Sequence, residues 1–285
     1  MSKKILITGS NGQLAKSILS IQKFNYRFIP TSLNNSKDTI YLDITDSDSV
    51  KNILLEYCPD IVINCAAFTN VDKAANNKKL CHDVNVNGVI NLSKHLSKST
   101  KLVHISSDYV FDGNSNDMYK EKDLTYPVNY YGKTKLEAEN YLIGTDNNNY
   151  LIFRPNVIYS HFGNNFFMFI YNSLKNNLSI NVVDDQISNP VFALDFGNII
   201  LESILMNLEG LFHYGSLDIL SRYDFAIKIA KYYNFDLNLI NKVSTQSLNQ
   251  LEQRPTNTSL DCSKIISQLD CDTFTTDESI RKIFI

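Results

Sequence analysis

The first half of the chain alternates short buried-strand patterns with amphipathic helix patterns, and this alternation strongly restricts the possible folds. Strand patterns occur at residues 4–7, 26–29, 40–42, 60–64, 101–105 and 150–154. Helix patterns lie between them at residues 14–21, 46–57, 80–96 and 131–141. Strands that alternate with helices predict βαβ units, in which helices cover both faces of a parallel sheet. We therefore expect an α/β fold built on a doubly wound parallel sheet.

The second half of the chain is less regular. Helix patterns occur at residues 166–174, 195–205 and 222–233, and strand patterns at residues 181–183 and 210–214. There is no internal repeat and no obvious linker. We expect a first domain over residues 1–155 and a smaller mixed α/β portion over residues 156–285, whose segments are free to return to the first domain.

Composition and charge exclude several classes of partner. The chain has 285 residues, a formal net charge of -3 and no long basic run, so we expect neither nucleic acid nor an anionic membrane as a partner. No apolar run approaches the length of a membrane span, and the apolar stretch near the N-terminus is too short for a signal peptide. The five cysteines lack C-x-x-C spacing and are odd in number. These features predict a cytoplasmic protein.

The residues between the first strand and the first helix predict a phosphate-binding loop. Residues 9–15 follow the pattern G-x-x-G-x-x-A, whereas most dehydrogenases have G-x-G-x-x-G. Glycines allow a tight turn and close approach of a pyrophosphate, and the helix N-terminus offers free N–H groups. An ordinary glycine turn is the alternative. The residues that we expect at a bound dinucleotide in this loop are Gly9, Asn11, Gly12, Gln13 and Leu14.

The end of the second strand indicates which dinucleotide is bound. An acidic residue there binds the ribose 2′-hydroxyl of NAD, but the sequence reads Pro30-Thr31-Ser32. Because an acid would repel a 2′-phosphate, its absence favours NADPH and leaves NADH open; Lys37 is the nearest basic residue. Asp43 and Ile44 follow the third strand and are expected to meet the adenine. Asp43 could instead be a turn residue that caps the next helix.

Tyr131 and Lys135 lie four residues apart, which is one turn on the same face of a helix. A lysine charge beside a phenol favours the phenolate and lowers the phenol pKa from about 10. Ser107 follows the strand at residues 101–105, and ligands bind beyond the carboxyl ends of parallel strands. With a nicotinamide on the phosphate loop, these three residues predict hydride transfer to a carbonyl.

With these motifs the chain resembles the extended short-chain dehydrogenases/reductases, which have a Rossmann sheet. Within them it is most similar to the dTDP-4-dehydrorhamnose reductase family. The similar stretches run along the whole chain, at residues 9–15, 64–74, 106–113, 127–135, 182–186 with Pro190, and 254–257 with 260–261. Ser-Asp-Tyr-Val-Phe-Asp-Gly and the late Arg-Pro and Leu-Asp pairs are the more specific ones.

The resemblance implies an NADPH- or NADH-dependent enzyme of cell-surface polysaccharide synthesis. It would reduce the 4-keto group of a nucleotide-linked 6-deoxyhexose, dTDP-4-dehydro-L-rhamnose or a close analogue. The resemblance implies that Tyr131 donates the proton, that Lys135 lowers the Tyr131 pKa and binds the nicotinamide ribose, and that Ser107 hydrogen-bonds the keto oxygen. The family usually has threonine at the position of Ser107.

Further site residues are implied by the same resemblance. Those along the cofactor are Cys65, Ala66 and Ala67, together with Tyr131 and Lys135. Those at the substrate are Thr69, Val71, Ser107, Asp108, Tyr109, Tyr131, Asn156, Gln186 and Arg254. A surface salt bridge is the alternative for Arg254, and a turn-forming role is the alternative for Asp108.

The chain departs from relatives at three informative places. Related sugar-nucleotide 4,6-dehydratases use an Asp-Glu pair to remove water, and Tyr109 in place of the second acid favours simple reduction. Val157 stands where the family has tryptophan, so the sugar can differ from the rhamnose precursor. Some members bind Mg²⁺ through glutamates at a dimer contact, the first of which falls at Ser17. We therefore expect no metal, and a monomer or a homodimer.

Two other functions remain open at this point. One is a sugar-nucleotide epimerase or epimerase-reductase. The other is a non-catalytic, nucleotide-binding regulatory subunit, because certain relatives have lost catalysis. The active-site residues of such subunits are usually eroded, whereas Ser107, Tyr131 and Lys135 are all present here.

Overall fold

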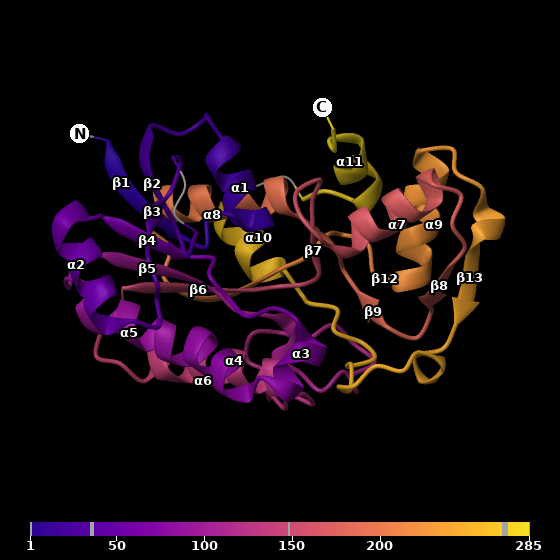
Figure 1. Cartoon of the computed structure of the whole chain (residues 1–285), viewed down its shortest axis with the longest axis horizontal. Helices are drawn as coiled ribbons and strands as arrows, with labels where there is room; N and C mark the ends of the chain where they lie inside the picture. Colours follow the sequence, from indigo (N-terminus) through magenta and orange to yellow (C-terminus); the bar gives the residue numbers. More distant parts are fainter. Residues whose placement is uncertain (1, 35–36, 148, 270–272, 285) are drawn as a thin grey trace.

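A seven-stranded parallel sheet forms the centre of the larger part of the molecule (Figure 1). The computed structural model describes residues 2–34, 37–147, 149–269 and 273–284. The strands lie in the order β3-β2-β1-β4-β5-β6-β11, and each neighbouring pair is parallel. Their bounds are β1 Lys3–Thr8, β2 Tyr26–Ser32, β3 Ile40–Tyr41, β4 Ile61–Asn64, β5 Lys101–Ile105, β6 Tyr150–Pro155 and β11 Gly210–Tyr214. The order reverses between β1 and β4, which confirms the expected doubly wound sheet.

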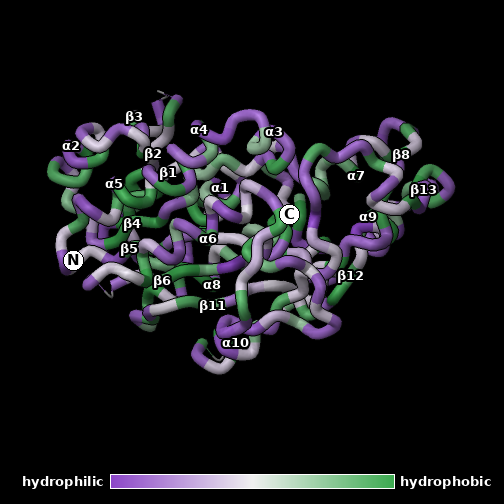
Figure 2. Tube along the Cα trace, turned by 90° about the horizontal axis from the view of Figure 1, so that it is seen from below, coloured by the Kyte–Doolittle hydropathy of each residue, from purple (hydrophilic) through white to green (hydrophobic). Residues whose placement is uncertain are grey.

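Helices cover both faces of this sheet. One face packs against α1 Gln13–Ser20, α8 Ala193–Leu205 and α10 Ser263–Leu269. The other packs against α2 Ser47–Tyr57, α5 Gly88–His95 and α6 Tyr130–Ile143. Within β1, Ile5 and Ile7 join the first core and Leu6 joins the second, as the two-residue period of a strand requires. Figure 2 shows hydrophobic segments around β1, β4 and β6, inside the larger part of the molecule on the left of the view.

A smaller lobe lies on the right of Figure 1. Its helices are α7 Phe166–Lys175, α9 Arg222–Tyr232 and α11 Thr276–Arg281. Its paired short strands are β7 Ile158–Tyr159 with β10 Val191–Phe192, β8 Ile180–Val183 with β13 Ile240–Val243, and β9 Ile187–Ser188 with β12 Leu220–Ser221. Aromatic side chains such as Tyr159, Phe167 and Phe225 dominate its core. Although α8, β11 and α10 follow residue 155, they pack on or within the central sheet.

The helix expected over residues 80–96 is divided into three parts, α4 Lys78–His82, a π-helical turn η1 Asp83–Asn87 and α5. Asn85 in the π turn is buried. Its side chain accepts from Phe68 N (2.8 Å) and donates to Phe68 O (3.1 Å) and Thr134 Oγ1 (3.0 Å). The loop after β4 is thereby fixed to α6. Apolar periodicity carries no signal of such contacts, so it does not predict the interruption.

The remaining short elements connect these layers. They are α3 Val71–Asn76 and the 3₁₀ turns η2 Asp108–Val110, η3 Leu237–Leu239 and η4 Thr245–Ser247. Asn70 caps α3 by accepting a hydrogen bond from Lys73 N. Within the described ranges, no helix is both long enough and apolar enough to cross a membrane.

The packing of α8 on the sheet gives the first prediction. Phe196 is fully buried, and its ring centroid lies 5.4 Å from that of Phe153 and 5.1 Å from that of Tyr214. Phe196→Ala leaves a cavity and should lower the free energy of unfolding by about 3–5 kcal/mol. The control Phe169→Ala removes a ring that is 50% exposed and should change it by less than about 1 kcal/mol. Urea denaturation followed by circular dichroism measures both, and equal losses would contradict this packing.

Candidate active site

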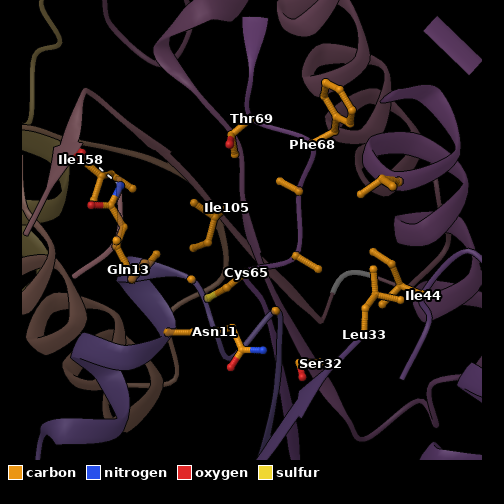
Figure 3. A pocket seen from close by; sticks show the side chains of 18 of the residues that line it. Asn11, Gln13, Ser32, Leu33, Ile44, Cys65, Phe68, Thr69, Ile105 and Ile158 are labelled. Carbon is orange, nitrogen blue, oxygen red and sulfur yellow. Dashed lines mark hydrogen bonds between the residues drawn. The ribbon is translucent and has the colours of Figure 1, made fainter. Parts of the chain in front are cut away.

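A cleft of about 660 Å³ opens at the carboxyl ends of the central strands. Loops after β1, β2, β3 and β4 line it, together with two side chains of α6. Every residue expected at the cofactor lines this one cleft, namely Gly9, Asn11, Gly12, Gln13, Leu14, Asp43, Ile44, Cys65, Ala66, Ala67, Tyr131 and Lys135. Figure 3 shows side chains from distant parts of the chain, such as Asn11, Ser32 and Thr69, around the same space.

The glycine loop is shaped by a close backbone approach. Gly9 has φ +63, and a Cβ there would lie 2.8 Å from the backbone N and Cα of Ala66. Gly12 is the N-cap of α1 and makes no side-chain cap, so the first N–H groups of that helix face the cleft without a capping side chain. Such a terminus favours a pyrophosphate. The loop therefore fits the phosphate-binding role that its sequence predicts.

Gln13 joins the glycine loop to the smaller lobe. Its Nε2 donates to Ile158 O (3.2 Å, dashed in Figure 3), and its Oε1 accepts from Ser160 Oγ (3.2 Å). The segment that follows β7 then contributes residues 162–164 to the cleft. Sequence reasoning missed this contribution because no motif marks it.

The part of the cleft beside the end of β2, where we expect the adenosine, carries no acid on that strand. The residues that β2 and its loop contribute are Ser32, Leu33 and Asn34. Asp43 also lines the cleft, and its Oδ1 accepts from the backbone N and the hydroxyl of Thr45 at 2.9 and 2.7 Å. Asp43 thus forms a local turn as well as facing the cleft, while the N-cap of α2 is Asp46.

The residues expected to perform the chemistry converge where β5 ends and α6 begins. Tyr131 and Lys135 line the cleft, and Lys135 Nζ donates to Ile105 O at 2.5 Å. Ser107 caps the η2 turn by accepting from Tyr109 N (3.1 Å). A Cβ at Gly132 would collide with Tyr109 O, so glycine lets α6 approach this turn closely.

The expectation that Lys135 brings the pKa of Tyr131 toward neutral is wrong for this structure. Burial raises the pKa of Tyr131 well above its ordinary value, and the adjacent Ser107 hydroxyl opposes this only in part. Burial also lowers the pKa of Lys135 to about 8, against the opposing influence of Glu139. Burial disfavours the charged form of each group, which raises the pKa of a phenol and lowers that of an ammonium. At neutral pH Tyr131 therefore holds its proton.

Asp108 lies beside the same hydroxyl. Ser107 Oγ donates to Asp108 Oδ1 at 2.9 Å. Burial raises the pKa of Asp108 to about 6, while hydrogen bonds from Thr258 and Ser107 and the charge of Arg222 act in the opposite direction. Arg222 begins α9, its guanidinium lies 5.2 Å from the ring centroid of Phe166, and it brings a positive charge from the smaller lobe to Asp108. Sequence reasoning missed Arg222, which belongs to no motif.

Several residues expected at the substrate are held by other parts of the protein. The two amide protons of Asn156 are donated to Asn189 Oδ1 and Thr258 O. Gln186 Nε2 donates to Thr245 Oγ1 at 3.0 Å. Arg254 forms an ion pair with Asp72, in which Nη2 lies 2.9 Å from Oδ2. A salt bridge was the alternative to substrate binding for this residue. Asn156 and Gln186 are thus hydrogen-bonded to other loops, and Arg254 joins its own segment to α3.

The other residues expected at the substrate lie near the candidate catalytic set. Thr69 lines the cleft, and Val71 begins α3 just beyond it. Tyr109 packs edge-on against Tyr131 with ring centroids 5.9 Å apart. Among the described residues, no group of three or more His, Cys, Asp or Glu side chains could hold a metal ion.

The chain belongs to the family whose model is described as "RmlD substrate binding domain", which matches residues 3–284. It is 34% identical over 274 residues to the dTDP-4-dehydrorhamnose reductase of Aggregatibacter actinomycetemcomitans, covering 92% of each protein. The crystal structure of dTDP-4-dehydrorhamnose reductase from Bacillus anthracis in complex with NADP has a TM-score of 0.93 and 30% identity, covering 100% of this chain and 99% of that one. The predicted family is confirmed.

A relative with a different name also matches. Methionine adenosyltransferase 2 subunit beta of Bos taurus is 28% identical over 276 residues, which covers 93% of this chain and 82% of that protein. Sequence similarity alone therefore spans an enzyme family and a subunit of another enzyme, and the site residues must distinguish them.

The close approach at Gly9 gives the second prediction. Gly9→Ala would push Cβ into the Ala66 backbone and should weaken NADPH binding at least about tenfold. Gly210→Ala is the matched control, because Gly210 also has a positive φ, +95, but a Cβ there would meet no atom within 4 Å, and Gly210 lines no part of the cleft. Isothermal titration calorimetry with NADPH measures both. Equal affinities for Gly9→Ala and the wild type would exclude this loop as the phosphate site.

Proposed function

We propose that this protein reduces the 4-keto group of a dTDP-linked 6-deoxyhexose with NADPH. The substrate is dTDP-4-dehydro-L-rhamnose or a close analogue, and the product is the corresponding dTDP-6-deoxyhexose. The observation that carries this proposal is the position of Tyr131 and Lys135 in the dinucleotide-sized cleft, with Ser107 on the adjoining turn. Family membership and the reductases among the relatives support the same reaction.

The cleft fits a dinucleotide. Gly9 leaves room beside Ala66 that any side chain would fill, and the N-terminus of α1 offers N–H groups for the pyrophosphate. Ser32, Leu33 and Asn34 would receive the ribose end, where the absence of an acid suits a 2′-phosphate. NADPH, when bound, supplies the hydride.

The chain supplies the proton. Because burial keeps Tyr131 protonated, its hydroxyl is a proton donor for the oxygen that gains charge during reduction. Ser107 gives its one hydroxyl proton to Asp108 Oδ1 in this structure and accepts from Tyr109 N. We propose that this proton turns from Asp108 to the same substrate oxygen when the sugar binds. Lys135 is anchored on Ile105 O one helical turn from Tyr131, and we propose that its positive charge stabilises the phenolate that forms.

Residues 156–285 supply the sugar side in this proposal. Arg222 from α9 approaches Asp108 and Tyr109, so a charged group of the smaller lobe faces the reacting end of the cleft. Val157, the second residue of this part of the chain, is much smaller than the tryptophan that the family has at this position. We further propose that the protein works in the cytoplasm, as a monomer or a homodimer.

Replacing Tyr131 separates the enzyme from a regulatory subunit. Purified protein should oxidise NADPH when dTDP-4-dehydro-L-rhamnose is added, and Tyr131→Phe should reduce kcat about 10²–10⁴-fold by removing the proton donor. The control is Tyr130→Phe, one position along the same helix and outside the cleft lining. Absorbance at the nicotinamide band measures both. Failure of the wild type with every keto-sugar nucleotide tested would refute the proposal and favour the subunit.

The pH dependence of kcat/KM gives a fourth prediction. The pKa of Asp108 is raised to about 6, so its carboxylate, which accepts from Ser107, is lost as pH falls through that value. The pKa of Lys135 is lowered to about 8, so its charge is lost as pH rises through that value. A bell-shaped profile with limbs near these values is expected. A flat profile between pH 5 and 9, measured at fixed ionic strength, would contradict it.

A further inference from the structure

Behind the cleft, α6 carries a second charged residue on the face of Lys135. Glu139 lies four residues further along, so the two side chains point to the same side of the helix. Both are buried, with exposed fractions of 1% for Lys135 and 0% for Glu139. A buried carboxylate needs partners, because its desolvation is otherwise very unfavourable. Those partners connect the cleft with the strands beneath it.

Arg154 on β6 holds the carboxylate from the other side. Its Nη2 donates to Glu139 Oε2 at 2.6 Å, and its Nε lies 3.0 and 3.1 Å from the two oxygens. The guanidinium also lies 5.1 Å from the Phe111 ring centroid and 3.4 Å from His213 Nε2. Burial and the Arg154 charge lower the pKa of His213 to about 3, so this histidine stays neutral. Arg154 is therefore committed to Glu139.

Ser106 connects this pair to the cleft. Its hydroxyl donates a short hydrogen bond to Glu139 Oε1, and Ser106 itself lines the cleft. One carboxylate thus fixes both a residue of the cleft wall and the arginine of the next strand. The neighbouring residue of Ser106 is Ser107, so the same contact also orders the start of the η2 turn.

Lys135 is faced by few charged groups. Four described side chains interact with its charge: Glu139 on the same helix, Cys65 after β4, Cys81 on α4 and His104 on β5. Burial raises the pKa of both thiols, that of Cys65 to about 12, and holds the pKa of His104 well below its usual range. These three groups are therefore neutral at pH 7. Among the described side chains, Glu139 is the one negative charge that faces Lys135.

We propose that Glu139 is a positioning residue of the reductase, which keeps Lys135 charged and fixes Ser106 at the wall of the cofactor cleft. The proposal rests on the proposed cofactor site but does not depend on which sugar is reduced. Glu139 acts through Lys135 and Ser106 and makes no contact with the reactants. A carboxylate that served only to pair Arg154 would stabilise the fold without influencing the charge of Lys135.

The test is the pH dependence of NADPH binding, measured by fluorescence titration without sugar. In the wild type, affinity should fall as pH rises through about 8, where Lys135 loses its charge. Glu139→Gln keeps the shape and removes the charge, so the midpoint of this loss should move about one unit or more to lower pH. Glu139→Asp keeps the charge on a shorter side chain, and its midpoint should lie between the two.

The matched control is Asp195→Asn. Asp195 is another buried carboxylate, on α8, which accepts from Ser279 Oγ and from Lys282 Nζ at 2.7 and 2.8 Å and does not line the cleft. Its loss should lower the Tm and leave the binding midpoint unchanged. Should Glu139→Gln fail to fold, Glu139→Asp decides the question by the same midpoint.

Two outcomes would overturn the proposal. One is that both Glu139 variants lose NADPH affinity at the same pH as the wild type and differ from it only in a lower Tm. Glu139 would then have a purely structural role. The other is a midpoint shift of equal size in Asp195→Asn. Because no sugar is present, these outcomes are separate from the proposed reaction. A wild type that binds NADPH and reduces no keto sugar would refute the reaction, and the midpoint shift would still support the role of Glu139.

Discussion

The close contact between Gly9 and the backbone of Ala66 is the constraint on which the site depends. It brings the loop after β1 against the loop after β4 at the point where the strand order reverses. Ligands bind at such a switch point because loops on either side separate there. The N-terminus of α1, the turn at Asp43 and the residues of α6 then surround one space. The sheet order thus creates the cleft. Because Gly9 has no side chain, a pyrophosphate can approach the backbone of the loop after β1.

Electrostatics at the reacting end follow from burial more than from the neighbouring charges. Burial shifts the pKa of both Tyr131 and Lys135 toward the neutral form, yet with a pKa of about 8 Lys135 is still mainly charged at pH 7. For a reductase this arrangement is suitable, because the phenol must hold a proton until the substrate oxygen becomes basic. Behind Lys135, Glu139 and Arg154 form a buried ion pair in which the two charges compensate each other. The carboxylate opposes the loss of charge on Lys135 that burial alone would cause.

Local sequence signals predicted the glycine loop, the alternating elements and the Tyr131–Lys135 pair, because each depends on residues close together in the chain. Contacts between distant segments were not predictable in this way. Asn85 is hydrogen-bonded to Phe68 in the loop after β4 and to Thr134 on α6, and Glu139 is hydrogen-bonded to Arg154 on β6. No periodic pattern in the sequence predicts either contact. Family resemblance predicted that Asn156 and Arg254 contact the substrate, but their side chains are bonded to other residues of the protein. The expected cofactor residues line one cleft, and the roles of single side chains at the substrate stay predictions.

We propose that this chain transfers a hydride from NADPH to the 4-keto carbon of a dTDP-sugar, with Tyr131 supplying the proton. The most direct measurement uses NADPH deuterated at the transferred position, with mass and NMR analysis of the product. We expect one deuterium at carbon 4 of the sugar and one NADPH consumed per product. A sugar that is epimerised without deuterium, or tight NADPH binding with no product, would contradict it.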